Sequence, residues 1–386
     1  AALPEISADF KTFTFRIRPG IHFADDLVFK GVKRELTADD YVYSLKRFYD
    51  PRWKSANLYL LESAGILGLS ELRQETIAAK KPFDYDREVD GLKALDRYTL
   101  QIRLSKPAPR LLHQIADPSF TGAVAREVVE FYGDKIGEHP VGTGPFVLKD
   151  WKRSSRIVLA RNPNYREVPY AEQPPAGNAR LVRDAQALAG RRLPLVDEVH
   201  IVITEEAQPR WLSFLNEEQD LLDVVPAEFS NIAFPNNVLA PHLAKRGMTM
   251  VRYPRGDISY TYFAMEHPMV GGYEPHKVAL RRAIGLATDV EREIRIVRRN
   301  QAVPAQSSIS PGNWGYDPAF KSEMSSYDVA RAKALLDLHG YVDRNGDGWR
   351  ELPDGQPLRL EYATQPDQLS RQTAELWQKN MNAIGL

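Results

Sequence analysis

The chain has 386 residues, which is long for one compact core and predicts two or three domains. Lysine plus arginine and aspartate plus glutamate both total 51, so the formal net charge is zero and the basic field that nucleic-acid binding requires is absent. Without cysteine there are no disulfides or thiol chemistry within these residues, and no apolar run approaches the roughly 20 residues of a membrane-spanning helix.

Two strands and one helix are predicted in the first 110 residues. Apolar and polar residues alternate over 12–18, the period of a half-buried strand, which ends at Pro19-Gly20. Thr37 is a suitable N-cap for a helix over 38–49. The same alternation over 100–105 predicts a second strand.

Residues 141–165, VGTGPFVLKDWKRSSRIVLARNPNY, predict a β-hairpin. Gly142 and Gly144 permit backbone angles that a Cβ resists, and Pro145 fixes the entry into an extended run. The first strand begins at Phe146, and a polar turn separates it from the second.

The region after the hairpin is predicted to mix strands and helices. Residues 167–194 are rich in Pro, Ala, Gly and Arg and predict a surface excursion, after which 199–203 reads as a strand and 209–215 as a helix. The alternation of short strands and helices from there to residue 386 favours an α/β arrangement over an all-β one.

Two further helices are predicted near the end of the chain. Residues 330–339 form a strong helical pattern closed by Gly340. Ser370 is a suitable cap for the last helix. One side of that helix carries Thr373, Trp377, Met381 and Ile384.

Several segments resemble the family 5 extracellular solute-binding proteins, the large peptide- and oligopeptide-type binding subunits of ABC importers. The hairpin sequence matches the pattern GTGPF…W…I.L.RNP.Y of that family. The other matching segments, in chain order, are FTFRIRPGIHFAD (13–25), LTADDYVYSLKRFYDP (36–51), LKALDRYTLQIRLSKPAP (92–109), ISYTYFAME (258–266), VALRRAIGLATDVERE (278–293) and DRNGDGWRELPDGQPLRLEY (343–362).

The resemblance implies an α/β fold, that of a two-lobed periplasmic binding protein of type II (cluster C) with an extra accessory domain. It implies a partial accessory domain over 1–110, a partial lobe I over 111–260 and the N-terminal part of lobe II over 261–386. The chain then corresponds to an internal fragment, truncated at both ends, and we expect such a fragment to lack a fully competent cleft.

The resemblance also implies a function. We expect the substrate-binding component of an ABC importer, a monomer at the periplasmic or extracellular face of a bacterial membrane, which delivers an extended ligand, first of all a peptide, to a membrane permease. Opines, nickel complexes and sugars remain open as ligands. No cofactor is implied, and the motifs of zinc peptidases, P-loop hydrolases and lipases are absent from the sequence. The alternative is a non-transport ligand sensor or a calcium-stabilised scaffold on the same fold.

An aromatic segment is the first candidate for ligand binding. Tyr260, Tyr262 and Phe263 lie where the resembled family lines its cleft with aromatic side chains. A second interpretation remains open, in which Tyr260 and Tyr262 alternate with Ala264 toward the core of a central strand.

Three further residues are candidates. Arg298 matches the position of a cation for the ligand carboxylate, although its neighbours Glu291 and Glu293 also fit a solvated, salt-bridged helix face. Trp314, in a loop with two glycines, can stack on a ligand side chain or close the loop against its own domain. Asp117 matches a position near the ligand tail.

A calcium loop is the sharpest chemical pattern in the sequence. Residues 343–354 place oxygen-bearing side chains at positions 1, 3, 5, 9 and 12 of an EF-hand loop. Two β-turns, at Asn345-Gly346 and Asp354-Gly355, explain the same residues without a metal. We therefore assign no metal ligand from the sequence.

Overall fold

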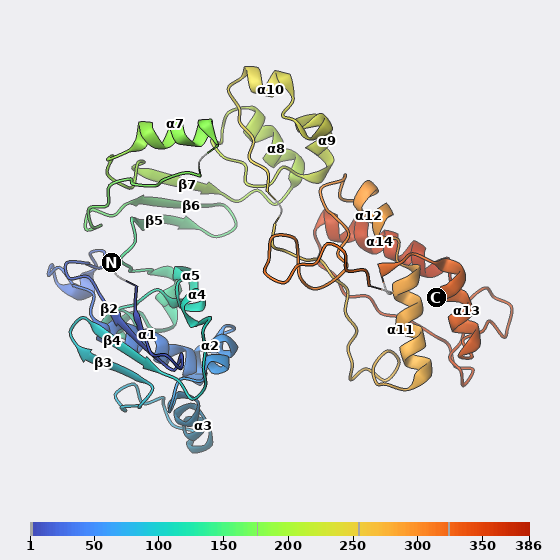
Figure 1. The fold of residues 1–386 in the computed structure, drawn as a ribbon, viewed down its shortest axis with the longest axis horizontal. Helices are drawn as coiled ribbons and strands as arrows, with labels where there is room; N and C mark the ends of the chain where they lie inside the picture. Colours follow the sequence, from blue (N-terminus) through green and yellow to red (C-terminus); the bar gives the residue numbers. More distant parts are fainter. Residues whose placement is uncertain (1–2, 176, 254, 323–324) are drawn as a thin grey trace. The chain divides into compact units, whose positions relative to one another are not determined.

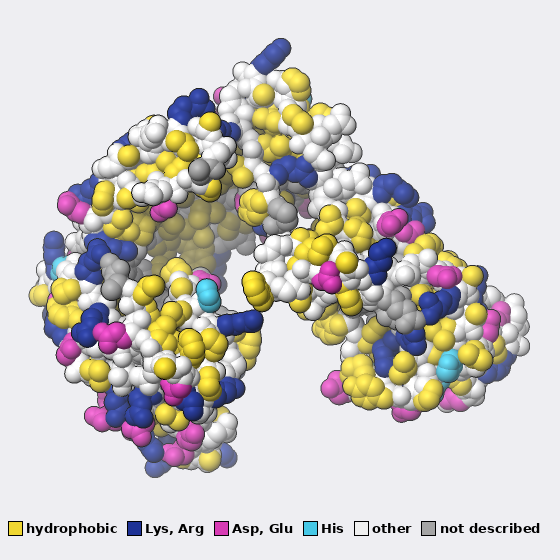
Figure 2. All heavy atoms as spheres, viewed as in Figure 1, with side chains coloured by type: hydrophobic (Ala, Val, Ile, Leu, Met, Phe, Trp, Pro, Cys, Tyr) yellow, Lys and Arg dark blue, Asp and Glu magenta, His cyan; other side chains and the backbone are white. Residues whose placement is uncertain are grey.

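The computed structural model describes residues 3–175, 177–253, 255–322 and 325–386. The chain forms two compact units, Ala1–Ile203 and Thr204–Leu386. In the part of the chain that is described, no helix combines the length and apolar character needed to cross a bilayer. Basic and acidic side chains are interspersed on the face shown in Figure 2, in keeping with the balanced charge.

The first unit begins with a small α+β part (Figure 1). Its strands are β1 (Glu5–Ile6), β2 (Thr12–Arg16), β3 (Leu92–Asp96) and β4 (Thr99–Arg103). Its α-helices are α1 (Ala38–Tyr49), α2 (Leu58–Ala64), α3 (Leu69–Ala79), α4 (Leu111–Ile115), α5 (Pro118–Thr121) and α6 (Arg126–Tyr132). Its 3₁₀ helices are η1 (Leu27–Phe29), η2 (Pro51–Trp53) and η3 (Gly133–Glu138).

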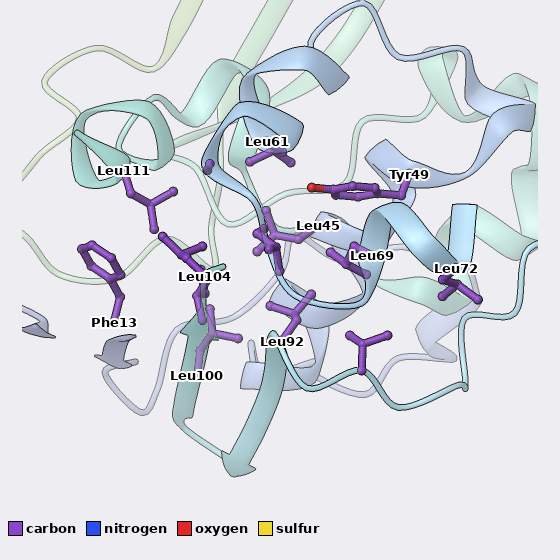
Figure 3. Packing of buried hydrophobic residues seen from close by; sticks show 14 of the residues in the cluster. Phe13, Leu45, Tyr49, Leu61, Leu69, Leu72, Leu92, Leu100, Leu104 and Leu111 are labelled. Atoms are coloured by element: carbon purple, nitrogen blue, oxygen red, sulfur yellow. The ribbon is translucent and has the colours of Figure 1, made fainter. Parts of the chain in front are cut away.

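The four strands form an antiparallel sheet in the order β1-β2-β4-β3. Phe13 pairs with Ile102 across β2 and β4, and both side chains are buried on the face against which α1 packs. Leu45 and Tyr49 of α1 reach the same core, and Figure 3 shows their side chains beside Leu61 and Leu69. The two strands and the helix predicted from the sequence are confirmed.

The start of α1 is fixed by a buried polar network. The Thr37 backbone N–H donates to Asp40 Oδ2 at 2.8 Å, and Arg34 donates to Asp40 Oδ1 at 2.6 Å and to Glu127 Oε1 at 2.6 Å. Asp40 is buried, so the Arg34 guanidinium compensates its charge. The same arginine therefore ties the loop before α1 to both α1 and α6.

A three-stranded antiparallel sheet completes the first unit. Its strands are β5 (Phe146–Lys152), β6 (Arg156–Arg161) and β7 (Glu198–Val202), in the order β5-β6-β7. The predicted hairpin and the later strand are confirmed. The predicted excursion does lie at the surface, and its second half contains a helix that was not predicted, α7 (Ala179–Leu188), behind the side-chain cap of Asn178.

The prediction that Gly142 and Gly144 adopt backbone angles that a Cβ resists is wrong. Neither Gly142 nor Gly144 has a left-handed φ, and a Cβ at either position would meet no atom within 4 Å. The backbone carbonyls of these residues carry the structural role instead. Gly142 O accepts from Ala24 N at 2.8 Å, and Gly144 O accepts from Asn162 Nδ2 at 2.8 Å.

A hydrogen-bonded clasp joins the hairpin to the N-terminal part of the first unit. Asn164 donates through Nδ2 to Asp25 Oδ1 at 2.6 Å and to Phe23 O at 3.3 Å. Buried Asn162 accepts from the Asn164 backbone N–H at 2.9 Å, which holds the Asn164 side chain in place. We call the bonds of Asn162 and Asn164, together with the bond from Ala24 to Gly142, the asparagine clasp.

The described residues of the second unit contain helices and irregular segments. The α-helices are α8 (Ala207–Leu215), α9 (Ser230–Ala233), α10 (Pro241–Lys245), α11 (Pro275–Ala287), α12 (Val290–Ile296), α13 (Val329–Leu338) and α14 (Gln368–Asn382). The 3₁₀ helices are η4 (Ala227–Phe229) and η5 (Pro235–Asn237). A core of α11, α13 and α14 includes Leu280, Leu336 and Met381.

Two expectations for this unit are wrong. The alternation of strands with helices does not occur among the described residues, although Leu358 and Leu360 face the core with the period of a strand, because these segments find no strand partner there. The cap of α14 is Asp367, which accepts from the Ser370 N–H at 3.0 Å, and not Ser370 itself.

Gly91 provides a test of the close packing in the first unit. A Cβ at this position would lie 2.3 Å from Leu67 N and 2.4 Å from Leu67 O, both backbone atoms. We expect Gly91→Ala to lower the free energy of unfolding by about 1–3 kcal/mol, measured by urea denaturation. Gly144→Ala is the control and should unfold at nearly the wild-type midpoint; equal effects of the two changes would contradict this packing.

Glu35 makes the stability of the first unit depend on pH. Its carboxylate accepts from Gly20 N at 2.7 Å, Arg97 Nη2 at 2.9 Å and Tyr98 Oη at 3.0 Å, and these bonds lower the pKa of Glu35 from 4.5 to about 2. The pKa of Glu35 is lower in the folded than in the unfolded chain. The stabilisation that the Glu35 carboxylate gives is therefore complete above pH 4.5 and disappears as the pH falls toward 2.

We therefore expect Glu35→Gln to destabilise the chain near neutral pH and to do so progressively less as the medium is acidified. The measurement is the thermal midpoint of both proteins over a pH series. A difference that stays constant from neutral to acid pH would show that the Glu35 charge is not responsible.

Candidate functional site

The exposed aromatic segment of the second unit, residues 258–263, is the centre of the candidate site. Tyr260 and Tyr262 are 77% and 78% exposed, and their ring centroids lie 6.2 Å apart at an interplanar angle of 53°. Phe263, the next residue, is partly buried and packs on the core that contains Leu280. The segment is thus anchored by one aromatic ring and presents two others to solvent, which excludes the core-facing interpretation of the tyrosines in this structure.

The backbone of this segment keeps its hydrogen-bonding capacity. Among the described residues we find no backbone hydrogen bond to the N–H or C=O groups of 258–263, and the segment belongs to no strand. An extended ligand can pair with such a free segment as an added strand while the tyrosine rings contact its side chains. The chemistry available here is binding by aromatic contact and main-chain pairing.

Arg298 lies just after α12 and is already paired. Its Nε donates to Glu293 Oε1 at 2.7 Å, and both side chains are only about one-fifth exposed, 22% and 20%. This partly buried ion pair fixes the position of the Arg298 guanidinium. The Nη groups of the same guanidinium can donate to a second acceptor. The expected ion pair is therefore present, and it does not remove Arg298 as a cation for a ligand carboxylate.

Trp314 is the most exposed aromatic side chain of the candidate set, at 95%. Gly312 and Gly315 on either side have φ of 86° and 88°, a left-handed conformation that favours glycine. Asn313 closes the turn, with its N–H donating to Ser310 O at 3.2 Å. The indole does not close the loop against its own domain, which was one of the two predictions, and it is available to a ligand.

One hydrogen bond and one close approach show that these segments of the second unit lie near each other. Arg252 Nη2 donates to Gln301 Oε1 at 3.1 Å, which joins the approach to the aromatic segment to the turn after Arg298. A Cβ on Gly256 would lie 3.6 Å from Asn313 Nδ2, which places the start of the aromatic segment beside the Trp314 loop. Arg252 and Gln301 were missed from the sequence because neither belongs to a motif or a periodic pattern.

Asp117 belongs to the first unit, whereas the other five candidates belong to the second. It occupies the turn between α4 and α5, where its carbonyl accepts from the Thr121 N–H at 3.1 Å and from Thr121 Oγ1 at 2.8 Å. Its side chain is exposed. A role for Asp117 in ligand binding stays a prediction.

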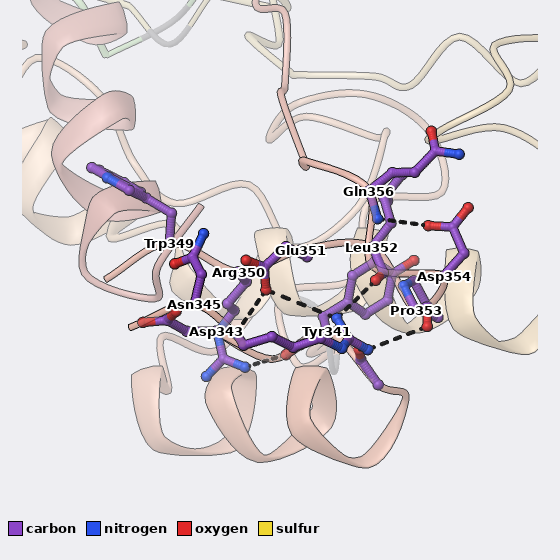
Figure 4. Close-up of polar contacts among 12 residues, drawn as sticks. Tyr341, Asp343, Asn345, Trp349, Arg350, Glu351, Leu352, Pro353, Asp354 and Gln356 are labelled. Carbon is purple, nitrogen blue, oxygen red and sulfur yellow. Dashed lines mark hydrogen bonds and ion pairs between the residues drawn. The ribbon is translucent and has the colours of Figure 1, made fainter. Parts of the chain in front are cut away.

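The loop over 343–354 uses its side-chain oxygens internally (Figure 4). Asp343 accepts from Gly346 N at 2.6 Å and from Gly348 N at 2.8 Å, and the bonds from the backbone, that of Gly348 above all, lower the pKa of Asp343. Glu351 accepts from Arg344 N at 2.8 Å. Within the described ranges no cluster of three or more His, Cys, Asp or Glu side chains suited to a metal is found.

The chain is similar to proteins named for the binding of dipeptides and oligopeptides. It is 26% identical over 345 residues to the dipeptide-binding protein of Escherichia coli, covering 86% of this chain and 52% of that protein. It is 35% identical over 160 residues to the periplasmic oligopeptide-binding protein OppA of Salmonella typhimurium, covering 41% and 26% respectively. The chain thus spans about half the length of the first of these relatives, and less of the second.

The fold is that of the α/β two-lobed periplasmic binding proteins. The structure of NikZ from Campylobacter jejuni, solved in complex with Ni(L-His), aligns with a TM-score of 0.68 at 19% identity, covering 99% of this chain and 62% of that one. The chain belongs to the bacterial extracellular solute-binding proteins, family 5, because the model of the middle region of that family matches residues 1–386. This confirms the family and the fold class expected from the sequence segments.

The loop geometry makes a direct prediction about calcium. Because Asp343 already accepts two backbone N–H bonds, we expect the thermal midpoint of the chain to be the same with added calcium chloride and with a chelator. Differential scanning calorimetry measures this. Asp343→Ala is the control that should lower the midpoint in both conditions, and a midpoint raised by calcium in wild type but not in this variant would establish a calcium loop.

Proposed function

We propose that this chain is the ligand-capturing part of the substrate-binding component of an ABC importer, and that its ligand is a peptide in extended form. The observation that carries the proposal is the aromatic segment 258–263. Its two exposed tyrosines, and a backbone without hydrogen bonds to other described residues, suit an extended peptide of any side-chain sequence, because main-chain pairing does not depend on side-chain identity.

The relatives support a peptide as the ligand. The two curated relatives are named for dipeptide and oligopeptide binding. Arg298 supplies a cation for the ligand carboxylate, with Glu293 holding its orientation. Trp314 adds an aromatic surface on the neighbouring loop, where a ligand side chain can stack. Asp117 belongs to the same proposal as a contact near the ligand tail.

Membership in the family supports the remaining parts of the proposal. The component is a monomer at the periplasmic or extracellular face of the membrane, works with a membrane permease, and carries out no catalysis. The proposed division is an accessory domain over 1–110, part of lobe I over 111–260 and part of lobe II over 261–386. The sensor and the calcium-stabilised scaffold are not favoured, because the carboxylates of Asp343 and Glu351 bond the loop's own backbone amides and the two relatives described above are named for dipeptide and oligopeptide binding.

The tyrosine pair provides the test. In the longest natural protein that contains this chain, we expect Tyr260→Ala with Tyr262→Ala to weaken binding of trialanine about tenfold, since each aromatic contact contributes about 0.5–1.5 kcal/mol. Isothermal titration calorimetry measures the affinity.

The matched control is Tyr273→Ala, which removes an equally exposed tyrosine of the second unit that lies outside 258–263. It should bind trialanine as wild type does. Unchanged affinity in the double variant, or an equal loss in the control, would reject the aromatic segment as the ligand surface.

A further inference from the structure

A cavity in the first unit lies outside the aromatic segment that carries the proposed function. It is bounded by the end of α1, by η2, by α3 with the loop that follows it, and by α6. Its volume is about 610 Å³, within the range of about 300–1,000 Å³ that is usual for small-molecule sites. All of its lining residues belong to Ala1–Ile203, so it is complete within one unit.

Four aromatic side chains form much of the wall. The ring centroids of Tyr43 and Tyr85 lie 4.8 Å apart, and those of Phe83 and Tyr85 lie 5.1 Å apart at 64°. Trp53 Nε1 donates to Tyr85 Oη at 3.1 Å, and Tyr85 Oη donates to Asp50 Oδ2 at 2.7 Å. These contacts fix the rings, so the wall is preorganised for a flat apolar group.

One tyrosine hydroxyl among the lining residues has no hydrogen-bond partner within the described chain. Tyr43 is 93% buried, since 7% of its surface is exposed, and its Oη has no hydrogen-bond partner among the residues that the structure describes. This oxygen is not one of the fully buried side-chain atoms that lack a partner, so it is accessible from the cavity. The phenol can donate a hydrogen bond to an oxygen of a ligand.

The charges around the cavity favour an anion. The acidic groups are engaged: Asp50 by Arg52 N and Tyr85 Oη, Glu130 by Arg126, and Asp134 by Arg52. Lys80 and Lys81 also line the cavity and are exposed, and neither ammonium has a partner in the described part of the chain. The charges of lining residues that have no partner in the described chain are therefore positive.

The arginines argue against an organic cation as the ligand. Arg47 and Arg52 lie over the Trp53 ring at 4.6 Å and 4.9 Å, and Arg126 lies 5.7 Å from the Tyr43 centroid. The aromatic faces that would attract a cation already have cations beside them. A second positive charge would be repelled by these guanidiniums.

We propose that this cavity binds a small aromatic carboxylate, with the ring between Tyr43, Phe83 and Trp53 and the carboxylate toward Lys80 and Lys81. The Tyr43 hydroxyl donates to the same ligand. This site would be separate from the aromatic segment 258–263 and takes a different chemical class, a flat organic anion rather than an extended peptide.

The experiment is isothermal titration calorimetry of the 386-residue chain with indole-3-acetate. We expect saturable binding with one ligand per chain. Lys80→Gln with Lys81→Gln should weaken it at least about tenfold, as removal of charge-assisted contacts does. Tyr43→Phe should weaken it less and leave the fold intact. Tryptamine, which replaces the carboxylate by an ammonium, should not bind.

The control is Lys30→Gln with Lys33→Gln, a lysine pair of the same unit that does not line the cavity; Lys30, like Lys80, is a left-handed helix C-cap. This control should bind as wild type does. Absence of indole-3-acetate binding, equal affinity in the Lys80/Lys81 variant, or tryptamine binding of similar strength would overturn the proposal. Loss of binding in the Tyr260/Tyr262 variant would assign the ligand to the second unit and would also overturn it.

Discussion

Burial of one face of α1 against the four-stranded sheet is the interaction on which the first unit depends. Leu45 and Tyr49 enter the core on that face, while Arg34 and Asp40 fix the start of the helix. Because α1 is held at its start and along one side, its other residues have fixed positions as well. Tyr43 and Asp50 line the aromatic cavity for this reason, so packing in the core and the shape of the cavity have a common origin.

In the second unit, exposed aromatic rings lie next to a partly buried ring that anchors their segment. Phe263 is held by the core of α11, α13 and α14, and the residues just before it, 259–262, are exposed. The partly buried ring of Phe263 thus fixes the position of the exposed Tyr262 ring. Such an arrangement suits the ligand surface that we propose for this segment, because a ligand surface must be apolar and yet accessible before the ligand arrives.

Local patterns predicted the main strands and the helix α1 of the first unit, and the helices α8, α13 and α14 of the second. The strands at 12–16 and 99–103 and the helix at 38–49 follow from side-chain periods and a cap, which are properties of adjacent residues. The pairing of a strand is not local, so the expected alternation of strands and helices toward residue 386 does not form among the described residues, although Leu358 and Leu360 pack on the core. The contact between Arg252 and Gln301 and the cavity around Tyr43 depend on residues far apart in sequence, for which a single sequence contains no signal.

The asparagine clasp has a consequence for cooperativity. Asp25 and Asn164 are separated by 139 residues, so the clasp closes a very long loop with a few hydrogen bonds and no covalent link. The entropy of closing such a loop is lost once, when the first bond forms, and the other bonds then form at little further cost. The clasp is therefore made and broken as a whole, and the hairpin sheet and the α+β part of the first unit should unfold in a single transition.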